Sequence, residues 1–154
     1  MDAIKERIPL QIVEDRLRLT AVVECSRLRV RRQLMDFVVD TGSSASYLSD
    51  KDVRRLQIPL RGRTAEKAVD FGGSRFMQIL LPSFRLHLLK EDKQRNDVVT
   101  LAVCLNALQT TKQSLEKRQV AQTLPSILGM DFLKGQRLSL HVLPAEGVAY
   151  LQKE

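Results

Sequence analysis

Apolar and charged residues alternate with a period of two in the first part of the chain. The segments 14–19 (EDRLRL) and 27–31 (RLRVR) place leucines and Val30 on one side and arginines on the other. Because successive side chains of a β-strand point to opposite faces, this alternation predicts half-buried strands. Residues 34–39 (LMDFVV) form a more apolar run, which is typical of a strand covered on both faces.

The next part of the chain predicts a short helix and then a hairpin. In residues 49–56 (SDKDVRRL) a serine is followed by an aspartate three positions later, which fits a capping box at a helix start. The runs 65–71 and 74–81 flank Gly72 and Gly73. A Gly-Gly pair between two extended runs is typical of a tight β-turn, so a β-hairpin is expected there.

Apolar and polar segments alternate in the second half of the chain. Residues 98–105 (VVTLAVCL) predict a buried strand, and residues 137–143 (RLSLHVL) predict a half-buried one. The charged residues 90–97 (KEDKQRND) predict a solvated turn. The polar segment 106–123 fits a surface helix and a loop equally well, so the pattern leaves its structure open.

Length and composition favour one globular domain over residues 1–154. The chain is 44% apolar, and only 5% of its residues are aromatic, without tryptophan, so base-stacking platforms are not expected. No run approaches the roughly 18 apolar residues of a membrane helix, and charges interrupt the N-terminus, so we expect no membrane segment and a cytoplasmic location.

Cysteine and histidine are scarce. Cys25 and Cys104 lie in apolar surroundings and form no Cys-x-x-Cys pair, so we expect reduced, partly buried thiols. With His87 and His141 as the two histidines, a zinc site has few ligands to draw on. Neither a metal nor another cofactor is expected.

The net charge is +7, from 25 basic and 18 acidic side chains. Arginines at positions 27, 29, 31 and 32, with those at 16 and 18, would form one basic face of a sheet. Such a face fits nucleic acid, but a solvated outer surface uses the same residues. We favour the solvated surface, so nucleic acid is not an expected partner.

One candidate for chemistry stands at the end of the apolar run 34–39. Asp40 comes directly after it, followed by Thr41 and by Gly42, which permits a tight turn. This order presents a carboxylate at a strand end. An ordinary turn in which the aspartate bonds its own backbone would use the same three residues.

The surrounding sequence resembles a known family. The string FVVDTGSSASYL resembles the active-site loop of aspartic proteases, and PSILGMDFL resembles the apolar-apolar-Gly segment near the end of each subunit in retroviral-protease-like members. The resemblance runs from about Leu34 to Leu143. It implies a mostly β, retropepsin-like fold: a closed or semi-closed β-barrel with one or two short helices.

The chain has a single Asp-Thr-Gly, which is half of an aspartic protease site. The resemblance therefore implies a homodimer that brings two Asp40 carboxylates together, with Thr41 bracing the loops and Gly42 allowing their close approach. Two carboxylates about 3 Å apart share one proton, so one activates a water while the other polarises the scissile carbonyl.

Three further positions are candidates for substrate binding. Gly72 and Gly73 occupy the place of the family's flap, which closes over a peptide, although a plain connecting hairpin would look the same. Ser43 follows the motif, where its hydroxyl would bond either the charged carboxylates or the turn backbone. Asp131 lacks a following Thr/Ser-Gly, so we expect it to cap a short helix instead of serving as a second acid.

The sequence therefore predicts a homodimeric aspartic endopeptidase acting on peptide or protein substrates. Two alternatives from other classes stay open. One is a module of the same fold that binds peptides or assembles without proteolysis, and the other is a basic domain associated with nucleic acid.

Overall fold

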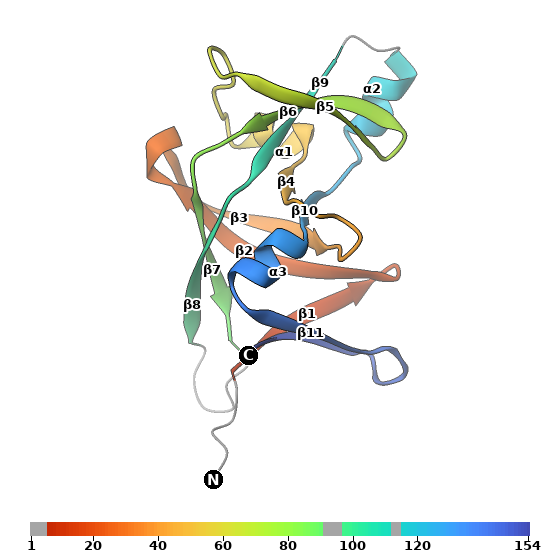
Figure 1. Cartoon of the computed structure of the whole chain (residues 1–154). Coiled ribbons are helices and arrows are strands. Elements are labelled where there is room, and N and C mark those ends of the chain that lie inside the picture. Colours follow the sequence, from red (N-terminus) through yellow and green to blue (C-terminus); the bar gives the residue numbers. More distant parts are fainter. Residues whose placement is uncertain (1–5, 91–96, 112–114) are drawn as a thin grey trace.

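A computed structural model describes residues 6–90, 97–111 and 115–154. Its strands join in one large sheet with the order β11-β12-β1-β2-β3-β10-β4-β9-β6-β5, and β7 and β8 branch from β2 (Figure 1). The mostly β prediction is confirmed. The path is open, because β11 and β5 end it without meeting, so the closed form of the expected barrel is wrong and the sheet does not close.

The strands within the described residues have the following bounds: β1 (Arg7–Val13), β2 (Arg16–Cys25), β3 (Val30–Val39), β4 (Tyr47–Leu48), β5 (Ala65–Phe71), β6 (Ser74–Leu80), β7 (Phe84–Leu89), β8 (Val98–Val103), β9 (Asn106–Thr110), β10 (Ser126–Leu128), β11 (Leu138–Leu143) and β12 (Val148–Lys153). The described ranges hold three α-helices, α1 (Asp50–Arg55), α2 (Leu115–Ala121) and α3 (Met130–Gly135), where one or two were expected.

The predicted half-buried strands are present at the N-terminus as β2 and β3, which pair antiparallel. Leu19 and Val30 are buried, as the period of two requires, and Leu28 is buried as well. Residues 27–29 do not continue the strand, however. A short 3-10 turn over Ser26–Leu28 joins β2 to β3, and Arg29 closes it at a φ of 56°.

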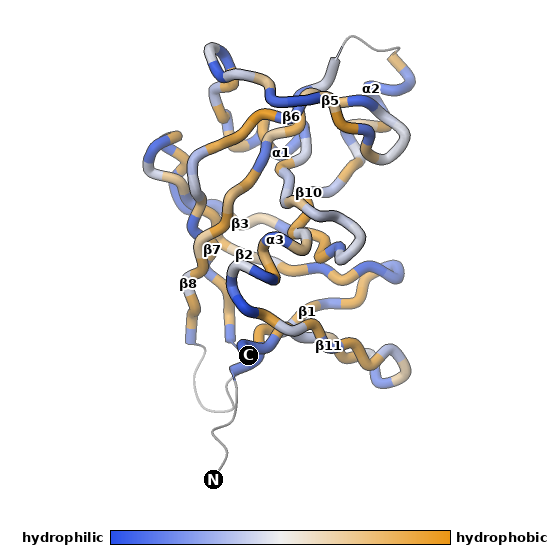
Figure 2. The backbone as a smooth tube through the Cα atoms, viewed as in Figure 1, coloured by the Kyte–Doolittle hydropathy of each residue, from blue (hydrophilic) through white to orange (hydrophobic). Residues whose placement is uncertain are grey.

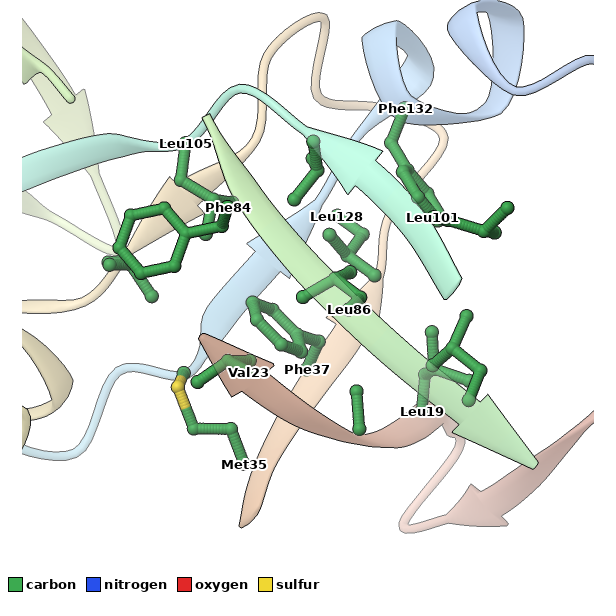
Figure 3. Close-up of a cluster of buried hydrophobic side chains, with 14 of the residues drawn as sticks. Leu19, Val23, Met35, Phe37, Phe84, Leu86, Leu101, Leu105, Leu128 and Phe132 are labelled. Atoms are coloured by element: carbon green, nitrogen blue, oxygen red, sulfur yellow. The ribbon is translucent and has the colours of Figure 1, made fainter. Parts of the chain in front are cut away.

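A core of aliphatic and phenylalanine side chains lies between β2, β3, β7, β8 and β10. Phe37, Phe84, Leu86 and Leu128 are fully buried within it and come together in Figure 3. Hydrophobic residues follow β8 and β10 along the tube in Figure 2. Replacing one of these phenylalanines with alanine would lower the free energy of unfolding by about 3–5 kcal/mol. This packing therefore holds β3 and β10 rigidly beside each other.

Several local expectations need correction. Residues 98–105 alternate between exposed and buried positions in β8, so the strand is half-buried and Cys104 is exposed, while Cys25 is buried. The open segment 106–123 contains a strand, β9, before helix α2. Most of the predicted turn at 90–97 lies outside the described residues. Within the described part, no helix is long and apolar enough to cross a membrane.

The hairpin β5–β6 and the three-stranded unit β11-β12-β1 lie at opposite ends of the molecule (Figure 1). Strand β10 lies between these ends, parallel to β3 and antiparallel to β4. The chain after β3 must therefore loop past the end of β10 before it returns as β4. That loop carries Asp40.

Candidate active site

The end of β3 is fixed by β10. Leu128 pairs with Val39 in the parallel register, and the backbone N–H of Asp40 donates to the carbonyl oxygen of Leu128 at 3.0 Å. This bond continues the pairing of β3 with β10 by one residue, up to the aspartate at which the turn begins. Asp40 is half-buried, so its carboxylate is held in place without being sealed from solvent.

The Asp-Thr-Gly turn is present, and in it Asp40 bonds its own backbone, as the ordinary-turn interpretation also expected. Asp40 Oδ1 accepts the backbone N–H of Gly42 at 2.9 Å, and the N–H of Ser43 donates to the carbonyl of Asp40 at 3.2 Å. A Cβ at position 42 would lie 3.1 Å from Asp40 Oδ1. Glycine therefore lets the backbone approach the carboxylate closely.

The hydroxyl of Ser43 bonds the turn backbone, one of the two roles weighed for it. Its Oγ donates to the carbonyl of Ala45 at 2.7 Å. A backbone hydrogen bond also joins this loop to the start of α3: the N–H of Met130 donates to the carbonyl of Ser43 at 2.8 Å. Ser43 therefore shapes the loop beside the aspartate.

A second network ties this loop to the start of α3. Ser46 Oγ donates to Asp131 Oδ1 at 2.6 Å and accepts the N–H of Gly129 at 2.9 Å. Asp131 Oδ1 also accepts the N–H of Phe132 at 2.7 Å. The cap residue of α3 is Gly129, so the expectation that Asp131 caps the helix is wrong; its carboxylate joins the helix to Ser46.

Gly129 sits where no side chain fits. A Cβ there would lie 2.3 Å from the carbonyl oxygen of Ala45 and 2.6 Å from that of Ser43. Both contacts are with backbone atoms, which cannot rotate away as a side chain can. The loop after β3 and the segment after β10 therefore pass in direct contact, and glycine is required between them.

A cleft of about 280 Å³ opens beside the aspartate. It is lined by Asp40, Gly42, Ser43, Ser44, Tyr47, Val69, Asp70, Phe71 and Leu108. The predicted site residues Asp40, Gly42 and Ser43 thus share one wall, and strand β5 of the hairpin provides another. Gly72 and Gly73 form the hairpin tip next to these walls, and the lining residues do not include them.

The hairpin reaches the Asp40 side of the molecule through apolar contacts. The ring centroids of Phe71 and Tyr47 lie 6.3 Å apart, within a small cluster centred on Phe76, Leu108 and Ala121. A Cβ at Gly72 would lie 2.4 Å from Leu124 Cδ2. The hairpin therefore packs against the Asp40 side of the molecule, where β5 forms one wall of the cleft, and α2 contacts it through Ala121.

Tyr47 supplies a polar group at the cleft wall. Burial raises the pKa of its phenol, and the charge of Asp131 raises this pKa further. The hydroxyl accordingly keeps its proton at neutral and acidic pH. It donates to Gln78 Oε1 at 3.5 Å, a weak bond between the loop side and strand β6 of the hairpin.

Thr41 takes a different direction from its two neighbours. It is exposed and lines a separate pocket of about 410 Å³ with residues of α3, β11 and the C-terminal Glu154. No sequence pattern predicts that the Asp-Thr-Gly turn is divided between two surfaces. Tyr47, Leu108 and Ser46 were also not predicted, because each depends on which distant strands pair.

Comparison with known proteins places this geometry in a family. A family model described as aspartyl protease matches residues 27–132. No curated protein matches the sequence. Among solved structures, a retropepsin-like aspartic protease from Rickettsia conorii aligns over 96% of this chain and 90% of its own, with 15% identity and a TM-score of 0.54.

A second solved structure is the EIAV protease in complex with an inhibitor. It aligns over 84% of this chain and 96% of its own, with 15% identity and a TM-score of 0.46. The family match and the Rickettsia structure together confirm the expected retropepsin-like fold.

Proposed function

Because the chain belongs to the aspartyl protease family, we propose that it is an aspartic endopeptidase whose site combines Asp40 from two copies of the chain. The observation that carries this proposal is the position of Asp40. Its carboxylate lies at a strand end, in the wall of a cleft whose opposite wall comes from strand β5 of the hairpin. An extended peptide in this cleft would lie between the hairpin and the Asp-Thr-Gly turn.

Two Asp40 carboxylates that share one proton provide a base and an acid. The unprotonated one removes a proton from a water as its oxygen attacks the peptide carbonyl carbon, and the protonated one gives its proton to the carbonyl oxygen. Collapse of the resulting diol breaks the C–N bond: the carboxyl that took the water's proton gives it to the leaving nitrogen, and the other carboxylate takes a proton from a diol hydroxyl, which restores the shared proton. The bond from Gly42 N–H to Asp40 Oδ1 holds one carboxylate oxygen in place throughout.

Part of the cleft lining is apolar and bears on which side chains a substrate presents. Val69, Phe71 and Leu108 provide this part, beside the polar side chains of Asp40, Ser43, Ser44, Tyr47 and Asp70. Burying an apolar side chain there removes its surface from water, worth about 25 cal/mol per Å². We expect cleavage next to apolar residues of the peptide.

The second copy would dock along β11. Strand β12 lies between β11 and β1, so both of its edges are occupied, and β11 is left as an edge strand. β11 (LSLHVL) carries no lysine, glutamate, aspartate or proline, the residues that usually protect an edge from pairing. Its Leu138 and Leu140 also line the Thr41 pocket, so a copy paired there would reach the Asp40 loop.

Placing a charge on this edge tests the dimer. In Val142→Lys we expect the concentration at which the dimer dissociates to rise at least about tenfold, and specific activity on a peptide mixture to fall in parallel on dilution. Val142 is 38% exposed, so the monomer should still fold. Sedimentation and peptide cleavage would be measured on the same dilution series.

Val98→Lys is the matched control. Val98 is 54% exposed on β8, an edge strand away from the Thr41 pocket. The control should sediment and cleave as the unmodified chain does. Equal dissociation of both variants would place the interface elsewhere, and a stable dimer that cleaves no peptide would favour a non-proteolytic binding module.

Replacing each of the two hairpin glycines with alanine should lower turnover to a different extent. Both have positive φ, 57° at Gly72 and 79° at Gly73, but only Gly72 faces a neighbour, Leu124. We expect Gly72→Ala to lower kcat/KM about tenfold, because it adds this collision to the strain of about 1 kcal/mol that both alanine variants share. Gly73→Ala should lower it about fivefold or less.

Thermal melting of both variants, compared with peptide cleavage, separates turnover from folding. Both should melt within a few degrees of the unmodified chain, since the hairpin tip is exposed. Unchanged kcat/KM in Gly72→Ala would show that the hairpin does not act as a flap.

A further inference from the structure

A second pocket lies where β2 turns into β3. It has a volume of about 480 Å³ and is lined by Glu24, Ser26, Arg29, Val30, Arg31, Arg32 and Arg85. Four of these seven residues are arginines, drawn from the 3-10 turn, the start of β3 and strand β7. The fold thus brings Arg85 of β7 next to three arginines that lie close together in the sequence.

Two of the arginines are held by one carboxylate. Glu24 accepts from the Nε of Arg32 and lies beside the Nε of Arg85, each at 3.3 Å, and His87 Nε2 lies 3.2 Å from it. The contact with His87 is the main cause that lowers the pKa of Glu24, against an opposing effect of burial, and both arginines lower it further. Glu24 therefore stays charged and anchors the two guanidinium groups at its sides.

The other two arginines have no such counter-charge. Within the described ranges, no carboxylate lies within ion-pair distance of Arg29 or Arg31, and both side chains are exposed. The pocket therefore holds four guanidinium groups against one carboxylate. Guanidinium groups pair with carboxylate and phosphate oxygens through two parallel hydrogen bonds, which makes an anion the fitting occupant.

The arginines do not form the continuous basic face that the sequence suggested. Arg16 and Arg18 lie at the other end of β2, about 25 Å away along the strand, and Arg18 binds the side chain of Gln11. No aromatic residue lines the pocket, so it offers no base-stacking platform. A local pocket of this kind suits several carboxylates of one peptide better than the extended backbone of a nucleic acid.

We propose that this arginine pocket, Arg29, Arg31, Arg32 and Arg85 around Glu24, binds an acidic peptide segment through its carboxylates. Its volume accommodates more than one such side chain. Arg31 lies nine positions before Asp40 on β3, about 30 Å along an extended strand. The segment would therefore be held without obstructing the cleft, and its binding does not depend on proteolysis.

The test is binding of a fluorescein-labelled peptide of alternating Glu and Ser, followed by fluorescence anisotropy. All proteins carry Asp40→Asn, so that the peptide stays intact whether or not the chain is a protease. Arg29→Gln with Arg31→Gln should weaken binding at least tenfold. Arg16→Gln with Arg18→Gln removes the same net charge at the other end of β2 and should change binding less than twofold.

Equal weakening in the two double variants would show that net charge alone attracts the peptide and would overturn the proposal, as would the absence of binding. A single-stranded RNA of equal length is tested in the same way. If it binds more tightly than the peptide, and Arg29→Gln with Arg31→Gln weakens its binding, the pocket binds nucleic acid and the proposal is overturned. Thermal melting checks that each variant folds. If the double variant does not fold, the test is repeated with Arg31→Gln alone, which changes an exposed position. This single variant must weaken peptide binding at least threefold.

Discussion

Asp40→Asn should abolish peptide cleavage, with a loss of at least about a thousandfold, and leave the fold intact. The amide oxygen of asparagine can still accept the N–H of Gly42, which now donates to Asp40 Oδ1 at 2.9 Å. The turn is therefore preserved. What the amide lacks is the acidic proton and the basic oxygen that the paired carboxylates use.

The measurement is cleavage of a diverse peptide mixture between about pH 4 and 7, read by mass spectrometry. Asp36→Asn is the matched control, since Asp36 is an exposed carboxylate on the same strand, bonded to Thr20 and outside the cleft lining. It should cleave at the unmodified rate. A hydroxyl-bearing transition-state mimic of the pepstatin type should inhibit the unmodified chain, and matching cleavage by Asp40→Asn would remove Asp40 from the mechanism.

Gly129→Ala should destabilise the fold more than other small changes near the site. The added Cβ would lie 2.3 Å from the carbonyl oxygen of Ala45 and 2.6 Å from that of Ser43. Relief requires the Asp40 loop to move away from β10, which also strains the bond from Met130 N–H to the Ser43 carbonyl. We expect a loss of about 3 kcal/mol, or a melting temperature lower by about 10 °C.

Gly135→Ala provides the comparison within the same helix. A Cβ at Gly135 meets nothing within 4 Å, and its φ is not in the left-handed region. This variant should melt within a few degrees of the unmodified chain or slightly above it, because alanine restricts the unfolded chain. Similar melting of Gly129→Ala and Gly135→Ala would mean that the two segments are not packed as described.

The parts of the fold that sequence predicts well have local causes. The hairpin follows from the Gly72-Gly73 turn between two extended runs, and both strands have nearly the predicted bounds. Helix α1 follows from Ser49, which occupies the cap position, although its hydroxyl bonds the Asp52 side chain at 3.2 Å. The turn at Asp40 follows from its short carboxylate and the glycine two positions later.

The parts that sequence reasoning misses depend on contacts with distant segments. Strand β9 forms within a polar segment because β4 and β6 pair with it on both sides, which overrides its weak pattern. Strand β12 was not predicted either, and it gains its structure by lying between β1 and β11. Tertiary pairing of this kind leaves little trace in a local window of residues.

The candidate site shows the same division. The tripeptide alone predicts Asp40 and Gly42 as site residues. The need for glycine at position 129, across the loop, is explained only by the structure, in which a Cβ there would collide with backbone oxygens. The string PSILGMDFL pointed to that segment without giving this reason. Likewise, Thr41 is next to Asp40 in sequence yet lines another pocket, because the turn directs the two residues to different surfaces.

The central claim is that one site needs Asp40 from two chains, and mixing tests it most directly. Unmodified chain and Asp40→Asn would be mixed in varying proportions at constant total concentration, allowed to exchange subunits, and assayed on one peptide. If both carboxylates are required, activity follows the square of the unmodified fraction and falls to about one quarter in an equal mixture. Activity that falls linearly, to about one half, would mean that each chain works alone and would contradict the shared site.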